Sequence, residues 1–316
     1  MFTIIDLYKN NKTKKIEKLD NSHIIEKHNF SYIFPIMLMK YGFFGSSSNY
    51  FNKKLYSFMA KRIYRKANKV FKSDMDCSQK ISKFINSNNF SEEQINEIKN
   101  KEFTVANYPT LNHFFTREIN MDLRNKITNK KKLGLYMPAS SRCKFIKIDS
   151  NKQFNIKGKD IILEDIGFTN NDCSIIMINR LIPSDYHRYH APASGKIIDI
   201  KEIVSDINIS VNDYVIPEFN PYTLNSRKIV SILLVNNDIL EICFIGATFV
   251  ADIIINKKIN DYVDAGTEIG YFKLGSCIIT KLNNVKISRK IKYDTEYYVH
   301  VKDKFGCLIN MINIID

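Results

Sequence analysis

The chain has 316 residues, 44% of them hydrophobic and 25% charged, a composition typical of a globular protein with an ample core. Basic residues outnumber acidic ones by 47 to 33, and the net charge of +14 indicates an anionic partner, either a nucleic acid or a membrane surface. No zinc-knuckle or RNP-like motif accompanies the charge, so we expect no nucleic-acid partner. The six cysteines form no C-x-x-C pair and no secretory signal is evident, which predicts no structural zinc and an intracellular, reducing environment.

The N-terminal third is predicted to be a polar tail followed by a helical, membrane-associating region. Residues 1–29 are rich in lysine and asparagine, which is typical of a poorly ordered tail. Residues 30–44 are strongly apolar, but they are too few for a spanning helix of roughly 20 residues. Residues 52–72 predict a basic helix without acids, whose apolar positions are Leu55, Met59, Ile63, Ala67 and Phe71. This helix suits an anionic bilayer, although an ordinary solvated helix has the same pattern, and we assign residues 30–105 to this region.

The rest of the chain predicts an antiparallel β domain. Two short helices are expected first, at 79–86 and 91–100, the second with a capping box made by Ser91 and Gln94. Beyond residue 133 short β-like runs follow one another with few helical periods between them, at 143–148, 154–156, 174–178, 196–200, 228–235, 239–245, 249–255 and 277–282. The turn at 236–238 joins two of them as a hairpin. The predicted fold class is α+β, with a helical N-terminal region followed by a mostly antiparallel β domain over residues 106–316.

Gly275 and Ser276 are the first pair with possible chemistry. A Gly-Ser pair between apolar runs is usually a tight turn between buried strands. It is also a bond that a chain can cut in itself, because the serine hydroxyl can attack the unhindered glycine carbonyl and shift the acyl group from nitrogen to oxygen. Elimination would then leave Ser276 as a pyruvoyl group at the start of a new chain. The pair alone does not decide between these readings.

The densest polar cluster is residues 183–192, bounded by two prolines. It holds Asp185, His187 and His190, and thus two of the six histidines of the chain. A His-x-x-His pair could be half of a metal site, but no third ligand is placed by spacing, and we expect no metal. Two histidines beside a carboxylate in a loop favour acid–base chemistry over a purely structural role.

Several motifs, taken together, resemble the phosphatidylserine decarboxylase family. The sequence DYHRYHAPASG at 185–195 precedes the Gly-Ser pair far upstream, as in that family, and the similarity runs from about residue 42 to the end. The other segments that carry it are Leu111–Arg117, Pro138–Ser141, Phe154–Gly158, Asn225–Arg227, Gly246–Val250 and Gly270–Cys277. Their order along the chain is that of the family.

The resemblance implies a self-cleaving enzyme. Cleavage between Gly275 and Ser276 would give a β chain of residues 1–275 and an α chain of residues 276–316, which stay associated. The pyruvoyl group made from Ser276 would form a Schiff base with phosphatidylserine, release CO2 and yield phosphatidylethanolamine, without PLP or metal. The family's self-cleavage base falls on His190, and its decarboxylation and protonation residues on His187 and Asp185. Substrate contacts fall on Phe114, Phe115 and Arg117.

One departure from the family pattern concerns the base. Ser140 stands where the family has the charge-relay aspartate, and the loss of such an aspartate slows serine proteases by about 10⁴. Asp149, Asp185 and Asp252 are the candidate substitutes. An uncleaved homologue that only binds anionic lipid is therefore the second hypothesis, and a pyruvoyl decarboxylase for a small amino acid is the third. The resemblance implies peripheral attachment to an anionic membrane containing phosphatidylserine, and it allows a homodimer.

Overall fold

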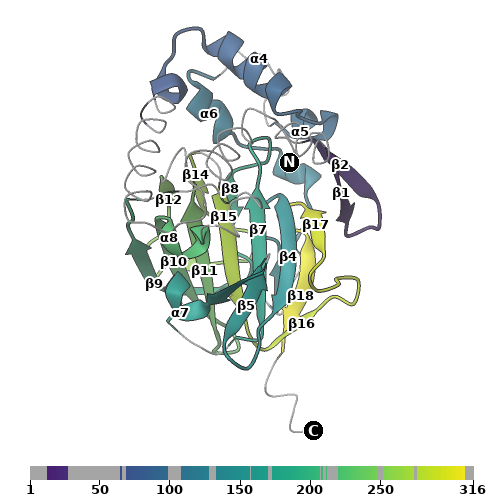
Figure 1. Ribbon diagram of the computed structural model, residues 1–316, viewed down its shortest axis with the longest axis vertical. Helices are drawn as coiled ribbons and strands as arrows, with labels where there is room; N and C mark the ends of the chain where they lie inside the picture. Colours follow the sequence, from purple (N-terminus) through teal and green to yellow (C-terminus); the bar gives the residue numbers. More distant parts are fainter. Residues whose placement is uncertain are drawn as a thin grey trace, which may run out of the picture.

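The computed structural model describes residues 13–27, 65, 69–98, 108–127, 133–156, 158–169, 173–206, 208, 211, 220–247, 252–273 and 276–309. These residues form a mostly antiparallel β protein with few helices, as the sequence predicts for its larger part. A large sheet dominates the molecule, and three helices lie across one end of it (Figure 1). The N-terminal helical region predicted for 30–105 is described only from residue 69 on, apart from Arg65.

The large sheet has ten strands in the order β13-β9-β10-β11-β15-β7-β4-β17-β1-β2. Every neighbouring pair is antiparallel except β1 and β17, which are parallel. Along the sheet, the bounds are Tyr262–Val263, Gly195–Ile203, Arg227–Leu234, Ile239–Gly246, Ser276–Leu282, Ile175–Leu181, Ser141–Lys147, Glu296–Val299, Thr13–Lys18 and His23–Lys27. The predicted strands at 143–148, 174–178, 196–200, 228–235, 239–245 and 277–282 are confirmed to within a few residues.

Smaller sheets complete the β domain. One has the order β12-β14-β8, with bounds Ile253–Ile255, Glu268–Phe272 and Arg188–His190. A second has the order β16-β18-β3, with bounds Val285–Ile287, Lys304–Leu308 and Gly134–Tyr136. A two-stranded sheet pairs β5 (Gln153–Ile156) with β6 (Lys159–Ile162), and the short helices α7 (Leu163–Ile166) and α8 (Pro221–Leu224) follow β6 and precede β10.

The large sheet is buried on both faces because apolar residues occupy successive positions in its central strands. In β11, Ile242 and Phe244 belong to one apolar cluster, while Cys243 and Ile245 belong to another on the opposite face. The first cluster includes residues of the two small three-stranded sheets, and the second includes residues of β5, β6 and α7. This double burial explains the continuous apolar runs, which a sheet with one solvated face would not show.

The helices pack around phenylalanine rings. They are α4 (Cys77–Ser87), α5 (Glu92–Asn96), α6 (Leu111–Phe115) and the 3-10 turn η2 (Met121–Leu123). The predicted capping box of α5 is confirmed: Ser91 Oγ accepts from Gln94 N at 3.1 Å, and the Gln94 side chain accepts from Ser91 N at 3.0 Å. Phe84 packs edge-on against both Phe114 and Phe115, which joins α4 to α6 across the predicted domain boundary near residue 105.

The structure corrects the N-terminal prediction in one part. Residues 13–27 were expected to be poorly ordered, but β1 and β2 form a hairpin whose first strand extends the large sheet beside β17. Main-chain pairing supports this edge hairpin although its sequence is polar and lysine-rich, as edge strands often are.

The predicted membrane segments fall largely outside the described residues. Residues 30–44 do so entirely, and of the predicted helix 52–72 only Arg65 and residues 69–72, all helical, are described. Phe71, the last residue of its apolar stripe, packs against the rings of Phe84 and Phe115, so this end of the stripe faces the protein. Within the described ranges, no helix has both the length and the apolar character needed to cross a membrane.

Candidate active site

The segment with the predicted cleavage bond is anchored at both ends to the chain around His187. Before the bond, Phe272 at the end of β14 donates its N–H to the His187 carbonyl at 3.0 Å. After the bond, β15 begins at Ser276, which pairs with Leu181 of β7. Gly275 lies outside the described residues, and of Ser276 only the main chain is described. The pairing thus brings the main chain of Ser276 to the end of β7, where the loop to β8 begins.

His187 is fully buried in this loop, and one of its ring nitrogens has no hydrogen-bond partner among the described residues. Its Nδ1 lies 2.9 Å from the Asp185 carbonyl oxygen, which only accepts, so Nδ1 carries the proton. Nε2 therefore presents a lone pair, and this atom is buried without a hydrogen-bond partner among the described residues. Burial, with the charge of Arg117 nearby, lowers the pKa of His187 to about 3 and keeps the ring neutral at neutral pH. A buried acceptor of this kind, on a titratable ring, is available to a ligand or a proton.

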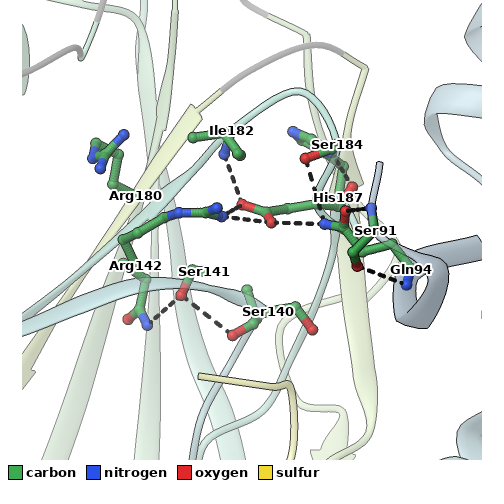
Figure 2. Close-up of polar contacts among 12 residues, drawn as sticks. Ser91, Gln94, Ser140, Ser141, Arg142, Arg180, Ile182, Ser184 and His187 are labelled. Carbon is green, nitrogen blue, oxygen red and sulfur yellow. Dashed lines mark hydrogen bonds and ion pairs between the residues drawn. The ribbon is translucent and has the colours of Figure 1, made fainter. Parts of the chain in front are cut away.

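Asp185 is held in a buried ion pair. Both of its carboxylate oxygens lie 2.6 Å from Nη1 of Arg142, and Oδ2 also accepts from the Ile182 N–H at 2.8 Å. Gln94 of α5 donates to Oδ1 at 3.4 Å, and Figure 2 shows Arg142, Ile182 and Gln94 converging from separate elements. The Asp185 carboxylate thus anchors its loop, and only its main-chain carbonyl bonds His187. Arg142 could not be recognised from the sequence, because a basic residue in a strand usually faces solvent.

The predicted substrate contacts form the wall behind His187. The ring of Phe115 lies over the His187 ring, with 3.9 Å between their centroids. Arg117 is 3% exposed, and its Nη2 donates to the carbonyls of Ser184 and Asp185 at 2.7 and 3.1 Å. Phe114 and Phe115 both belong to the helical aromatic cluster, and the Arg117 guanidinium lies 5.2 Å from the centroid of the Phe114 ring. Phe115 and Arg117 adjoin His187 directly, and Phe114 packs behind Arg117.

His190 is bonded at both ring nitrogens. Nδ1 lies 2.9 Å from the Gly266 carbonyl oxygen and so carries the proton, and Nε2 lies 3.0 Å from the Tyr186 hydroxyl, which donates to it. Burial lowers the pKa of His190 to about 4 and raises the pKa of the Tyr186 phenol, so both groups are neutral at neutral pH. The sequence pointed to His190 but to neither of these partners.

None of the candidate carboxylates bonds the His190 ring. Asp149 accepts from the main chain of Asn151 and Gln153 in an exposed turn, Asp185 pairs with Arg142, and Asp252 pairs with Lys273 at 3.1 Å. Ser140 is buried, and its hydroxyl accepts from the Val301 N–H at 3.1 Å. Asp252 does approach the cleavage segment through Lys273, but it contacts neither histidine in the described structure.

One group of potential metal ligands occurs elsewhere among the described residues. Ligand atoms of Glu93, Glu97 and His300 lie within 4.8 Å of one another. Their carboxylates already have cationic partners, because Glu97 pairs with Arg124, and Glu93 lies 3.6 Å from Lys18. A cleft of about 1050 Å³ adjoins this group and includes neither His187 nor His190 in its lining. We assign no metal site to it.

The comparisons with known proteins agree with this geometry. The family model described as "Phosphatidylserine decarboxylase" matches residues 111–303, which is more than half of the chain and spans α6, both histidines and Ser276. The chain belongs to the phosphatidylserine decarboxylase family. This confirms the resemblance carried by the sequence motifs, and it places the DYHRYH loop and the Gly-Ser pair within the part shared with the family.

Individual relatives show the same similarity. The chain is 32% identical over 235 residues to phosphatidylserine decarboxylase proenzyme 2 of Saccharomyces cerevisiae, covering 72% of this chain and 20% of the yeast protein. It is 30% identical over 245 residues to the phosphatidylserine decarboxylase proenzyme of Clostridium tetani, covering 72% of this chain and 78% of that protein. The Fusobacterium nucleatum proenzyme is 28% identical over 249 residues, with 74% and 80% covered. The chain thus spans about a fifth of the yeast relative and about four fifths of the bacterial ones.

Proposed function

We propose that this chain is the precursor of a phosphatidylserine decarboxylase that cuts itself between Gly275 and Ser276 and then converts phosphatidylserine into phosphatidylethanolamine and CO2. The observation that carries the proposal is His187, whose buried Nε2 has no hydrogen-bond partner among the described residues and whose carbonyl holds Phe272, four residues before Ser276. Membership in the family supports the reaction class. The relatives' names include the word proenzyme, which supports processing of a precursor.

The residues around Ser276 fit a pyruvoyl group. Nε2 of His187 is an acceptor and needs a donor, which the N–H groups of the substrate amine would supply once the substrate is held at a pyruvoyl group. The group would be held at the start of β15, between β11 and β7. Its ketone supplies the electron sink that makes loss of CO2 from the bound amino acid headgroup possible. No metal or PLP is needed in this scheme.

The two histidines then have separate tasks. His190 takes the proton of the Ser276 hydroxyl during self-cleavage, using Nε2 after the Tyr186 hydroxyl has moved aside. His187 is neutral with its lone pair at Nε2, so it begins as a proton acceptor. The substrate amine arrives as an ammonium and must lose a proton before it reacts. The proton is returned to the carbon atom that loses CO2, so the proton count balances. His187 relays it as a transient imidazolium, because a low pKa makes the neutral ring a weak base and the protonated ring a strong acid toward that carbon.

The lipid substrate reaches the site from a bilayer surface. The sequence of residues 30–44 and the basic helix at 52–72 support peripheral attachment to an anionic membrane. The two fragments stay together because β15 follows the cleavage bond, and it is hydrogen-bonded to β11 on one side and to β7 on the other, both in the larger fragment.

The test is an intact-mass measurement on the purified chain. We expect two masses, for residues 1–275 and 276–316, with the smaller fragment blocked at its N-terminus. Ser276→Ala should remain as one chain without decarboxylase activity, and Ser140→Asp should cleave faster, because a carboxylate stabilises the imidazolium of His190. A folded wild-type protein that stays intact through long incubation and still binds anionic liposomes would favour the lipid-binding homologue instead.

A further inference from the structure

The base proposed for self-cleavage has an orienting partner that the sequence did not reveal. In a serine-based triad, the orienting group accepts the Nδ1 proton and thereby holds the lone pair at Nε2, facing the nucleophile. Family members use an aspartate, which is Ser140 in this chain. The Ser140 hydroxyl bonds Val301, and His190 bonds a main-chain carbonyl instead, that of Gly266.

The Gly266 carbonyl is held in place by a turn tied to the strand that carries His190. Thr267 N donates to the Asp264 carbonyl at 2.9 Å, which closes the turn. Gly266 N then donates to the Ala191 carbonyl at 2.7 Å, and Ala191 N donates to the Thr267 carbonyl at 2.8 Å. The turn and the residue after His190 are therefore joined by reciprocal main-chain bonds, and the acceptor aimed at the imidazole has little freedom to move.

Glycine suits position 266 in this arrangement. Its φ of +81° lies in the left-handed region that side chains disfavour, and an added Cβ would come within 2.5 Å of Ile127 Cδ1. A side chain here would strain the turn and push on Ile127, and we expect this to shift the carbonyl that receives the Nδ1 proton.

We propose that the Gly266 carbonyl replaces the missing aspartate as the group that orients His190 for self-cleavage. Gly266 is then a positioning residue that acts through His190. This inference rests on the proposed self-cleavage. The carbonyl performs one of the two tasks of a carboxylate: it selects the Nδ1–H tautomer and orients the ring, but it carries no negative charge to stabilise the imidazolium.

The charges around His190 also keep its ring neutral, as expected where no carboxylate is paired with it. Arg188 and Lys302 act on the ring as cations, and Glu268, which pairs with His190 across β8 and β14, is engaged by Arg188 at 3.0 Å. Tyr186, at Nε2, stays protonated. Burial and the two cations keep the pKa of His190 near 4, so the base is unprotonated throughout the neutral range. Self-cleavage should therefore continue at mildly acidic pH, where a carboxylate-paired histidine would be protonated.

The direct test reads the tautomer and does not depend on cleavage. The Ser276→Ala precursor, labelled with ¹⁵N-histidine, should show His190 protonated at Nδ1, with Nε2 as the acceptor. This state should persist at pH 5.5, and Ser276→Ala/His190→Gln identifies the signals. A proton on Nε2, or a titration midpoint between about 6 and 7 as in an unperturbed histidine, would overturn the inference. If wild-type chain cleaves normally in that case, the proposed function stands and only this inference fails.

Matched glycine variants test the effect on rate. Gly266→Ala should slow self-cleavage of freshly translated precursor by at least about tenfold, because the carbonyl moves away from Nδ1. Gly158→Ala is the control, since Gly158 has a similar φ of +80° with no atom within 4 Å of an added Cβ, and it should cleave within about twofold of wild type. Ile127→Ala/Gly266→Ala removes the steric clash, so the double variant covers the case in which Gly266→Ala does not fold.

Ser140→Ala separates the two candidate orienting groups. It should cleave within about twofold of wild type if the carbonyl orients His190. A loss of tenfold or more in a folded Ser140→Ala precursor would show that Ser140 and its bond to Val301 position the base, and would overturn the assignment to Gly266. Cleavage of Gly266→Ala and of its double variant at the wild-type rate would overturn it equally.

Discussion

His187 and His190 lie three residues apart, yet their surroundings leave them with different capacities. Both donate Nδ1–H to a main-chain carbonyl, both are buried, and both are held neutral. At Nε2 they differ: His190 accepts from Tyr186, whereas the His187 atom has no described partner. Both rings carry the proton on Nδ1, but Nε2 of His190 already accepts a hydrogen bond, whereas Nε2 of His187 is available to accept one. This difference in access, more than in basicity, supports the separate roles proposed for them.

The largest expected effects come from replacing each histidine in turn, which tests whether the two have separate roles. His187→Gln should leave self-cleavage intact and reduce decarboxylation by about 10²–10⁴, the usual contribution of a general acid–base group. His190→Gln should instead block cleavage and leave a single chain. Fragment masses and CO2 release, measured on the same preparations, separate the two outcomes. If His187→Gln stayed uncleaved, the open acceptor would belong to self-cleavage and the assignment would have to be reversed.

The next test concerns the ion pair between Arg142 and Asp185, which anchors the loop that carries His187. Arg142→Met leaves the Asp185 carboxylate buried without its partner, which should lower the free energy of unfolding by about 3–5 kcal/mol. Lys144→Met is the matched control on the same strand, because the Lys144–Asp294 pair is largely exposed and should contribute less than about 1 kcal/mol. Urea denaturation of Ser276→Ala precursors carrying each change measures both. Equal, small losses would mean that the buried pair does not hold the loop.

The lowered pKa values of the two histidines predict how stability depends on pH. In the unfolded chain each histidine binds a proton below about pH 6.5, whereas the native rings stay neutral to about pH 4 or below. The free energy of unfolding should therefore fall as pH decreases through this window, by up to about 1.4 kcal/mol per pH unit for each histidine. Denaturation curves of Ser276→Ala between pH 7 and 4.5 test this. Removing either histidine should flatten the slope, and an unchanged slope in both variants would refute the burial argument.

The smallest expected effect comes from the Tyr186 hydroxyl, which donates a hydrogen bond to Nε2 of His190. Tyr186→Phe removes a donor from Nε2, which frees the lone pair and should speed self-cleavage about two- to fivefold, an effect worth less than about 1 kcal/mol in the barrier. The change should leave decarboxylation by the mature enzyme within about twofold, because His187 has its own surroundings. Slower cleavage of Tyr186→Phe would show that the hydroxyl takes part in the proton transfer instead of blocking it.

Much of the β domain could be predicted because its strands are apolar and its turns have clear signals. The hairpin of β10 and β11 is the best case: two apolar runs flank Asn236–Asp238, and Asn237 adopts a φ of 65°. The β1–β2 hairpin could not be predicted, because its lysine-rich strands are held by main-chain pairing at a sheet edge, which leaves no apolar pattern.

The site was predictable where side chains carry the chemistry and unpredictable where the main chain does. Two histidines between prolines indicate acid–base work from the sequence alone. The acceptors of their Nδ1 protons are the carbonyls of Asp185 and Gly266, and a carbonyl is common to all residue types. Arg142 was missed because its burial depends on an ion pair with a residue 43 positions away.

The place of β15 and β17 in the large sheet has a consequence for the timing of self-cleavage. Both follow Ser276 in the chain, and each fills an interior position between strands that precede the cleavage bond: β15 between β11 and β7, and β17 between β4 and β1. While the ribosome is still making them, the sheet has two gaps, and the anchor of Ser276 against Leu181 has not formed. If the chain cuts itself as proposed, the geometry needed for the cut is completed only by strands of the smaller fragment. Translation order would then protect the nascent polypeptide from being severed before it has folded.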